Sequence, residues 1–137
     1  MDQFADAGTN VTIDPATLDA ANATVILQAT NDITISDAVD LSDTTGAGFV
    51  AQAGNDIIVN ASITTDAGVI HLEADSPHSG GAYDGSGQVK INAQINTCGG
   101  AVSGDGGLVE TSSKGALSVT GRVDASAPNG QLGIFLL

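Results

Sequence analysis

The sequence predicts an all-β protein, a parallel β-helix (β-solenoid) of about five coils. Short alternating aliphatic segments recur, with copies that begin at residues 11, 33, 57, 89 and 117, so that they are 22, 24, 32 and 28 residues apart. Hydrophobic residues make up 42% of the chain but aromatic residues only 3%, with no Trp, so aliphatic side chains must build the core in thin layers. Glycine (18) far exceeds proline (3), which indicates turns made by Gly, Asn and Asp.

The main repeat reads aliphatic, x, aliphatic, x, small or polar, x, aliphatic. It fits residues 33–39, 57–63, 89–95 and 117–123, and residues 11–18 form a looser first copy. β-Branched residues at period 2 predict strands with one buried face. Such short strands must stack coil on coil in parallel. We expect one interior column of Ile35, Val59, Ile91 and Val119, a second of Val39, Ile63, Ile95 and Val123, and a bend between them at Asp37, Ala61, Ala93 and Gly121.

A second pattern lies between these copies. It occupies residues 25–29, 49–53 and 70–74, with further copies expected at 108–111 and 132–136. Nearly identical Asn-Asp turns, Asn31-Asp32 and Asn55-Asp56, join two of these segments to the next strand. Residues 14–21 are the only helix-like stretch, and a strand–turn–strand interpretation fits them equally well.

The chain is expected to form a single β-helix domain over residues 1–137, with Gly-rich loop insertions at 75–88 and 96–107. Insertions of this kind are where repeat proteins place function, although most loops are spacers. The loop side chains expected to face a partner are those of His78, Tyr83, Asp84 and Asp105.

Charge and composition exclude several classes of protein. The formal net charge of −13 leaves no electrostatic footprint for nucleic acid or anionic lipid. One Cys excludes an internal disulfide framework and a multi-cysteine metal site. The chain shows no signal peptide and no apolar run of membrane-spanning length, so we expect no membrane insertion and an export signal outside this chain.

No catalytic, cofactor or metal residues are predicted. Asp37, Asp40 and Asp43 are close in sequence, and Asp32 and Asp56 stack at one turn, but turn carboxylates usually bond their own backbone. The segment 80–87 departs from the Gly-Gly-x-Gly-x-Asp calcium loop of repeat-in-toxin proteins, because Tyr83 replaces the third Gly, Asp84 comes one residue early and no tandem copy follows. Cys98, His71 and His78 offer a nucleophile and imidazoles without an orienting group; His71 should point outward from its strand.

The segment 107–130, with Val-Glu-Thr-Ser followed by Val-Asp-Ala-Ser-Ala-Pro-Asn-Gly, resembles the filamentous-haemagglutinin-like exoproteins of Gram-negative bacteria. Residues 54–63 are similar to the same family, and the resemblance extends over roughly residues 10–137. It implies a right-handed parallel β-helix in a large secreted or surface-exposed protein, exported through a partner outer-membrane transporter in the two-partner secretion manner. The Asn-Pro-Asn-Leu signature of the family's secretion domain is missing, which indicates a fragment of the repeat region.

The resulting hypothesis is a non-enzymatic, structural or adhesive segment of a secreted or cell-surface exoprotein. Its partner would be a component of a host or neighbouring-cell surface or matrix, and its open β edges could give end-to-end self-association. The alternative is a carbohydrate-active β-helix enzyme acting on polysaccharide, which would need two carboxylates about 5–10 Å apart.

Overall fold

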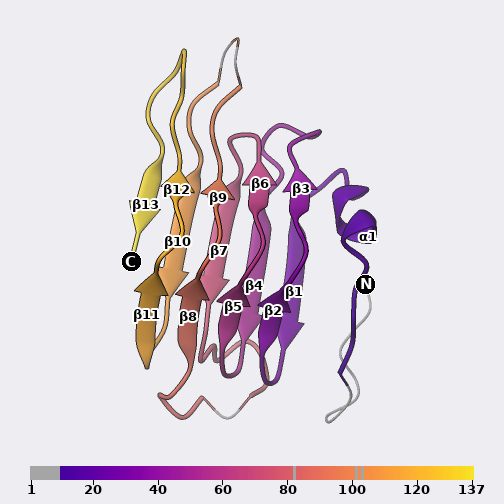
Figure 1. Cartoon of the computed structure of the whole chain (residues 1–137), viewed down its shortest axis with the longest axis vertical. Helices are drawn as coiled ribbons and strands as arrows, with labels where there is room; N and C mark the ends of the chain where they lie inside the picture. Colours follow the sequence, from indigo (N-terminus) through magenta and orange to yellow (C-terminus); the bar gives the residue numbers. More distant parts are fainter. Residues whose placement is uncertain (1–9, 82, 101, 103) are drawn as a thin grey trace.

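The computed structural model describes residues 10–81, 83–100, 102 and 104–137. Its strands repeat in groups of three, and each group makes one coil of a solenoid (Figure 1). The coils are β1 (Val25–Ala29), β2 (Ile33–Ile35) and β3 (Val39–Leu41); β4 (Phe49–Ala53), β5 (Ile57–Val59) and β6 (Ile63–Thr65); β7 (Val69–Glu73), β8 (Gln88–Ile91) and β9 (Ile95–Asn96); and β10 (Leu108–Ser112), β11 (Ala116–Val119) and β12 (Val123–Asp124). β13 (Ile134–Leu136) begins a fifth coil.

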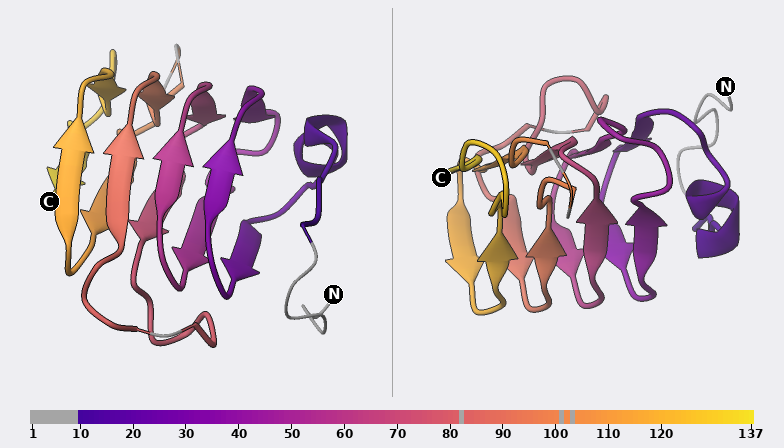
Figure 2. Two further views of the ribbon diagram at one scale, coloured as in Figure 1. Left: turned by 60° about the horizontal axis from the view of Figure 1, so that its bottom comes forward. Right: turned by 90° about the horizontal axis from the view of Figure 1, so that it is seen from above.

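Equivalent strands of successive coils pair in parallel and form three sheets. The first sheet has the order β1-β4-β7-β10-β13, the second β11-β8-β5-β2 and the third β12-β9-β6-β3. Figure 2 shows the coils side by side along the solenoid axis, from indigo at the N-terminal end to yellow at the C-terminal end. The predicted parallel β-helix is therefore confirmed.

Both predicted interior columns are present. Ile35 pairs with Val59, Val59 with Ile91, and Ile91 with Val119. The second column runs through Val39, Ile63, Ile95 and Val123. Val59 is fully buried and Val119 is 37% exposed, because Val119 lies in β11, the last strand of the second sheet.

The four predicted bend residues all lie at bends between the second and third strands of their coils. At Gly121 the chains approach so closely that a Cβ atom would lie 2.0 Å from the carbonyl oxygen of Ala93. A small residue is therefore required at this corner for steric reasons.

The N-terminal segment differs from the repeat predicted for it. Residues 11–18 do not form a first copy of the repeat: residues 10–14 contain no strand, and α1 (Pro15–Asp19) is a short helix. Asp14 caps it by accepting a hydrogen bond from the amide of Ala16 at 3.0 Å, and Pro15 occupies the first helical turn. The helix packs Leu18 against the core, and Asp19 accepts a hydrogen bond from the amide of Asp40 at 2.8 Å. It thus covers β3 at the N-terminal end of the solenoid (Figure 1).

Hydrogen-bonded side chains also link the coils. Gln28 donates to Gln52 at 2.8 Å, and Gln52 donates to Glu73 at 2.9 Å, on the outer face of the first sheet. Between the second and third coils, the buried Thr65 hydroxyl donates to that of Thr97 at 3.0 Å, and Thr97 donates to the Gly68 carbonyl at 2.6 Å. Because each buried hydroxyl has a partner, these threonines replace aliphatic residues in the core without an unsatisfied polar group.

The C-terminal end of the solenoid leaves apolar side chains in contact with solvent. Leu117, Leu132, Ile134, Leu136 and Leu137 are between 39% and 76% exposed. These residues lie in or beside β11 and β13, the last strands of their sheets. Unpaired strand edges with apolar side chains favour pairing with another β segment.

The turns between the first and second strands of a coil differ sharply in length. Residues 30–32, 54–56 and 113–115 connect these strands in the first, second and fourth coils, with three residues each. In the third coil the connection is 74–87, with fourteen residues, so it is eleven residues longer (14 − 3). The other long connections are 97–107 and 125–133, and they project from the opposite side of the solenoid (Figure 1). Gln88 and Asn96, at the edges of the predicted loops, lie in strands β8 and β9.

Candidate functional site

The fourteen-residue connection 74–87 is anchored to the solenoid at its start. The backbone amides of Ala74, Asp75 and Ser76 donate to the carbonyl oxygens of Ser112, Asn55 and Ala53 at 3.0, 3.1 and 2.8 Å. Since these three carbonyls belong to neighbouring coils, the first residues of the connection continue the sheet ladder before the chain turns outward.

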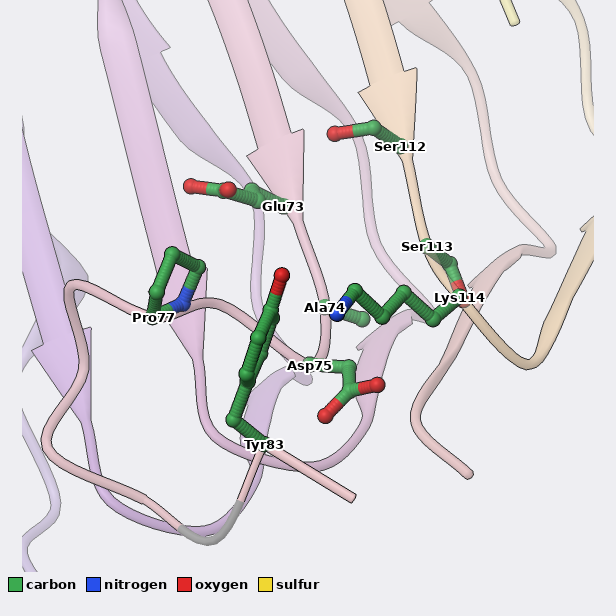
Figure 3. Close-up of a pocket in the computed structure, with 8 residues that line it drawn as sticks. All are labelled: Glu73, Ala74, Asp75, Pro77, Tyr83, Ser112, Ser113 and Lys114. Carbon is green, nitrogen blue, oxygen red and sulfur yellow. The ribbon is translucent and has the colours of Figure 1, made fainter. Parts of the chain in front are cut away.

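A pocket of about 200 Å³ lies between this connection and the short turn of the fourth coil. Figure 3 shows its lining, with Glu73, Asp75 and Tyr83 on one side and Ser112, Ser113 and Lys114 on the other. The pocket therefore combines carboxylate, hydroxyl, ammonium and aromatic groups from two coils.

Asp75 is the most unusual residue of this pocket. Its side chain is 1% exposed, and neither carboxylate oxygen has a hydrogen-bond partner. Its backbone has a φ of 54°, in the left-handed region that Asp tolerates better than most residues. A buried polar group without a partner is costly, so a ligand that pairs with this carboxylate would stabilise the loop.

Tyr83 and Lys114 contact each other across the pocket. The Lys114 Nζ atom lies 3.2 Å from the centroid of the Tyr83 ring, a cation–π contact. Tyr83 remains 41% exposed and has a φ of 50°. The ammonium group is thus held on the ring, and no ion pair joins it to Asp75 in the part of the chain that the structure describes.

Glu73 is occupied by structural contacts. Its Oε2 atom accepts hydrogen bonds from Gln52 at 2.9 Å and from the Ser76 hydroxyl at 2.8 Å. Glu73 therefore anchors the start of the connection to the outer polar ladder.

The four residues expected to face a partner do not form one site. His78, Tyr83 and Asp84 are exposed on the connection 74–87. Asp105 is exposed on the connection 97–107, on the opposite side of the solenoid (Figure 1), and lines a separate pocket of about 340 Å³ with Gln131 and Leu132. Its carboxylate accepts a hydrogen bond from the Gln131 amide at 2.8 Å, which joins the two neighbouring loops.

Carboxylates at the turns bond to local backbone, as the sequence indicates. Asp84 accepts from the Ser86 hydroxyl at 2.5 Å and from the Ser86 amide at 3.0 Å, and these bonds hold its pKa below the usual value. Asp40 makes the same pair of bonds with Ser42, which likewise lowers its pKa. Such Asx turns stabilise the loops.

Asp32 and Asp56 bridge coils at equivalent turns. Asp32 accepts hydrogen bonds from the Asn55 side chain at 2.8 Å and from the Asp56 amide at 3.0 Å. Asp56 in turn accepts from the Gln88 amide at 2.9 Å and lies 3.9 Å from Lys90. The repeated Asn-Asp turn thus links successive coils by hydrogen bonds from backbone amides to the aspartate side chains, beside the backbone hydrogen bonds of the same turns.

Cys98 and the two histidines lie apart. The Cys98 Sγ atom is 3.2 Å from a carboxylate oxygen of Asp124 and 3.2 Å from the Ser126 hydroxyl. Hydrogen bonds from Ser126 and from Cys98 lower the pKa of Asp124. His71 is half-buried on the outer face of β7, with its Nδ1 atom 3.6 Å from Glu110. His71 therefore points outward as predicted, and its contact is with Glu110.

Within the described ranges, no three His, Cys, Asp or Glu side chains gather closely enough to hold a metal ion by themselves. The described helical segments also include none with the length and apolarity needed to span a membrane. No family model, curated protein or solved structure matches the chain.

The sequence pattern does not indicate that Glu73, Asp75 and Lys114 line one pocket. In the sequence, Asp75 is the first residue of a predicted loop, and Lys114 is one residue of a turn in another coil. The one signal that points to them is the third coil's extra length, since the longer connection reaches the neighbouring coil. Their contact with Tyr83 depends on the path of that connection.

Proposed function

We propose that the chain is a structural, adhesive β-helix segment of a large secreted or surface-exposed bacterial exoprotein, and that it is non-enzymatic. The observation that carries the proposal is the eleven-residue lengthening of one turn in an otherwise regular solenoid. Three sheets in continuous register form a rigid scaffold, and the connection 74–87 extends from it with His78, Tyr83 and Asp84 exposed. Rigid scaffolds with variable loops are typical of binding proteins.

The ligand of this surface is proposed to be a component of a host or neighbouring-cell surface or matrix. In the full-length protein, an outer-membrane transporter would be the partner during export, as the resemblance of segment 107–130 implies. A transporter gene beside the reading frame would support this part of the proposal.

The role of the long connection can be tested by replacing it with a short turn from another coil. Residues 74–87 are replaced by the three-residue turn Gly54-Asn55-Asp56 of the second coil, which connects the same two sheets. The labelled wild-type chain is expected to bind host cells, bacterial cells or extracellular matrix, and the variant is expected to lose that binding while keeping its β circular dichroism spectrum. Equal binding by the folded variant, or no binding by the wild type to any of these surfaces, would contradict the proposal.

One observation favours the carbohydrate-active alternative. The pocket places the Tyr83 ring near Glu73 and Asp75, and an aromatic ring beside carboxylates suits a sugar. Against it, Glu73 is engaged by Gln52 and Ser76. Release of reducing sugar from polyuronides or neutral polysaccharides, lost on Asp75→Asn, would favour the enzyme.

A further inference from the structure

The two ends of the solenoid differ in how well their core side chains are covered. Ile33 and Leu117 stand at the two ends of one inward column, and they are 9% and 39% exposed. Ile35 and Val119 stand at the two ends of the next column, and they are 6% and 37% exposed. In the second and third coils, the residues of both columns are at most 1% exposed. The first coil is therefore nearly as well covered as the inner coils, whereas the fourth coil is not.

The helix α1 contributes to the cover at the N-terminal end. Leu18 and Ala21 pack against the core, and Asp19 accepts a hydrogen bond from the Asp40 amide at 2.8 Å. Figure 1 shows α1 at one end of the stack of coils, beside β3, and β11 and β13 at the other end. A second copy that continued the parallel ladders from the N-terminal end would have to displace this helix. Head-to-tail stacking of copies is therefore obstructed.

The C-terminal end, which we call the open end, combines strand edges with apolar side chains. Strands β11, β12 and β13 are the last strands of the three sheets. The Ile134 amide donates to the Gly107 carbonyl at 3.0 Å, so the alternation of the strand directs the next amide, that of Phe135, toward the free edge. Ile134 and Leu136 are exposed, and Phe135 is partly buried against the core. Such an edge favours pairing with another β strand.

The distribution of charge favours contact between two open ends. Residues 106–137 carry two acidic and two basic side chains, so their formal charge is zero (2 − 2). The remaining 14 acidic and one basic side chains, which give the net charge of −13, lie in residues 1–105. Residues 10–48, which include α1 and the first coil, contain six Asp and neither Lys nor Arg. Two open ends can approach without strong repulsion, whereas two N-terminal ends repel each other.

We propose that the open end binds the open end of a second copy of this chain, which gives a closed, twofold-symmetric dimer. A twofold axis perpendicular to the first sheet reverses the strand direction and keeps the inward side of the sheet inward. Strand β13 therefore pairs with β13 of the second copy in the antiparallel sense, and the two cores become continuous. Because both open ends are then covered, association stops at two copies. This interaction is independent of the proposed adhesive function.

The first sheet offers a matched pair of positions for the test. Leu136 and Ile26 lie at opposite ends of one outward row, which runs through Glu110, His71 and Val50. Both side chains are exposed, so a lysine at either position is compatible with the fold. Each substitution changes the net charge equally, from −13 to −12 (−13 + 1). Only Leu136→Lys places the new charge at the open end.

Sedimentation equilibrium and light scattering of the full chain, at fixed salt over a range of concentrations, measure the association. The mass of the wild type should rise with concentration and level off at twice the 13.5 kDa of one chain. Ile26→Lys should behave in the same way. Leu136→Lys should keep the mass of one chain and the β circular dichroism spectrum. Ile134→Lys, a second exposed position of β13, should show the same loss of association.

Three results would overturn the proposal. A wild type that stays monomeric at every concentration would assign the open end to another occupant, such as a further coil. A mass that keeps rising beyond two chains would demonstrate head-to-tail stacking in spite of α1. Equal loss of association in Ile26→Lys and Leu136→Lys, or in neither, would show that the contact does not use the open end.

Discussion

Shortening two side chains of one interior column, one buried and one partly exposed, tests whether packing between coils determines the stability of the protein. Val59 and Val119 belong to the same column, but Val59 is fully buried between two coils and Val119 is 37% exposed at the last one. Val59→Ala removes two buried methyl groups at about 0.8 kcal/mol each. The void between neighbouring coils adds about 1 kcal/mol, for a total of about 2.5 kcal/mol.

The same chemical change at Val119 should cost about 1 kcal/mol. Over a third of that residue is already in water, and the space that it leaves is open, so no closed void forms. The difference of about 1.5 kcal/mol corresponds to roughly 5 °C in melting temperature for a domain of this size. Thermal melts followed by circular dichroism, with urea unfolding as a second measure, would determine both values.

Equal melting temperatures for Val59→Ala and Val119→Ala would refute this reasoning, since the two variants differ only in burial. A charge gives a stronger form of the test. Val59→Asp buries an unpaired carboxylate, costs several kcal/mol and should unfold the chain, whereas Ser62→Asp, on the outward side of the next bend, should change the midpoint little.

Three further predictions concern buried polar groups, ionisation and association. Thr97→Val should lower the free energy of unfolding in urea by about 1 to 3 kcal/mol, because the buried Thr65 hydroxyl loses its acceptor. The double variant with Thr65→Val should be little less stable than Thr97→Val alone, and fully additive losses would contradict the pairing. Ser86→Ala should raise the pKa of Asp84 toward the ordinary carboxyl value in a ¹³C NMR titration, and an unchanged pKa would contradict the hydrogen bond. Because the folded-state pKa of Asp84 is lowered, its contribution to stability is present above the ordinary carboxyl pKa and is lost as the pH falls through the folded value. Self-association measured by light scattering should increase with salt, because salt screens the repulsion due to the charge of −13. It should disappear when residues 132–137 are made polar. A wild-type chain that is monomeric at both low and high salt would contradict this prediction.

The sequence alone determined the repeating architecture. Each coil buries the same alternate positions of its short strands, so Ile35, Val59 and Ile91 recur in step and their pairing follows from period and spacing. The bends at Ala61 and Ala93 could be predicted for the same reason, since a corner between two strands needs a small residue. These features depend on local pattern and on contacts between equivalent residues of adjacent coils.

Tertiary structure decided the N-terminal segment and the pocket. Residues 14–21 fitted two local conformations, and the packing of Leu18 against the core accompanies the helix. The pocket combines Asp75 and Tyr83 of the third coil with Lys114 of the fourth, residues that share no repeat position. The fourteen-residue connection has no counterpart of the same length at this corner in the neighbouring coils, which have three residues there, so the path of its middle part follows from contacts that no sequence period encodes. The sequence therefore determined the stacking of the coils. Only the tertiary structure decided that the Asp75 carboxylate is buried without a hydrogen-bond partner.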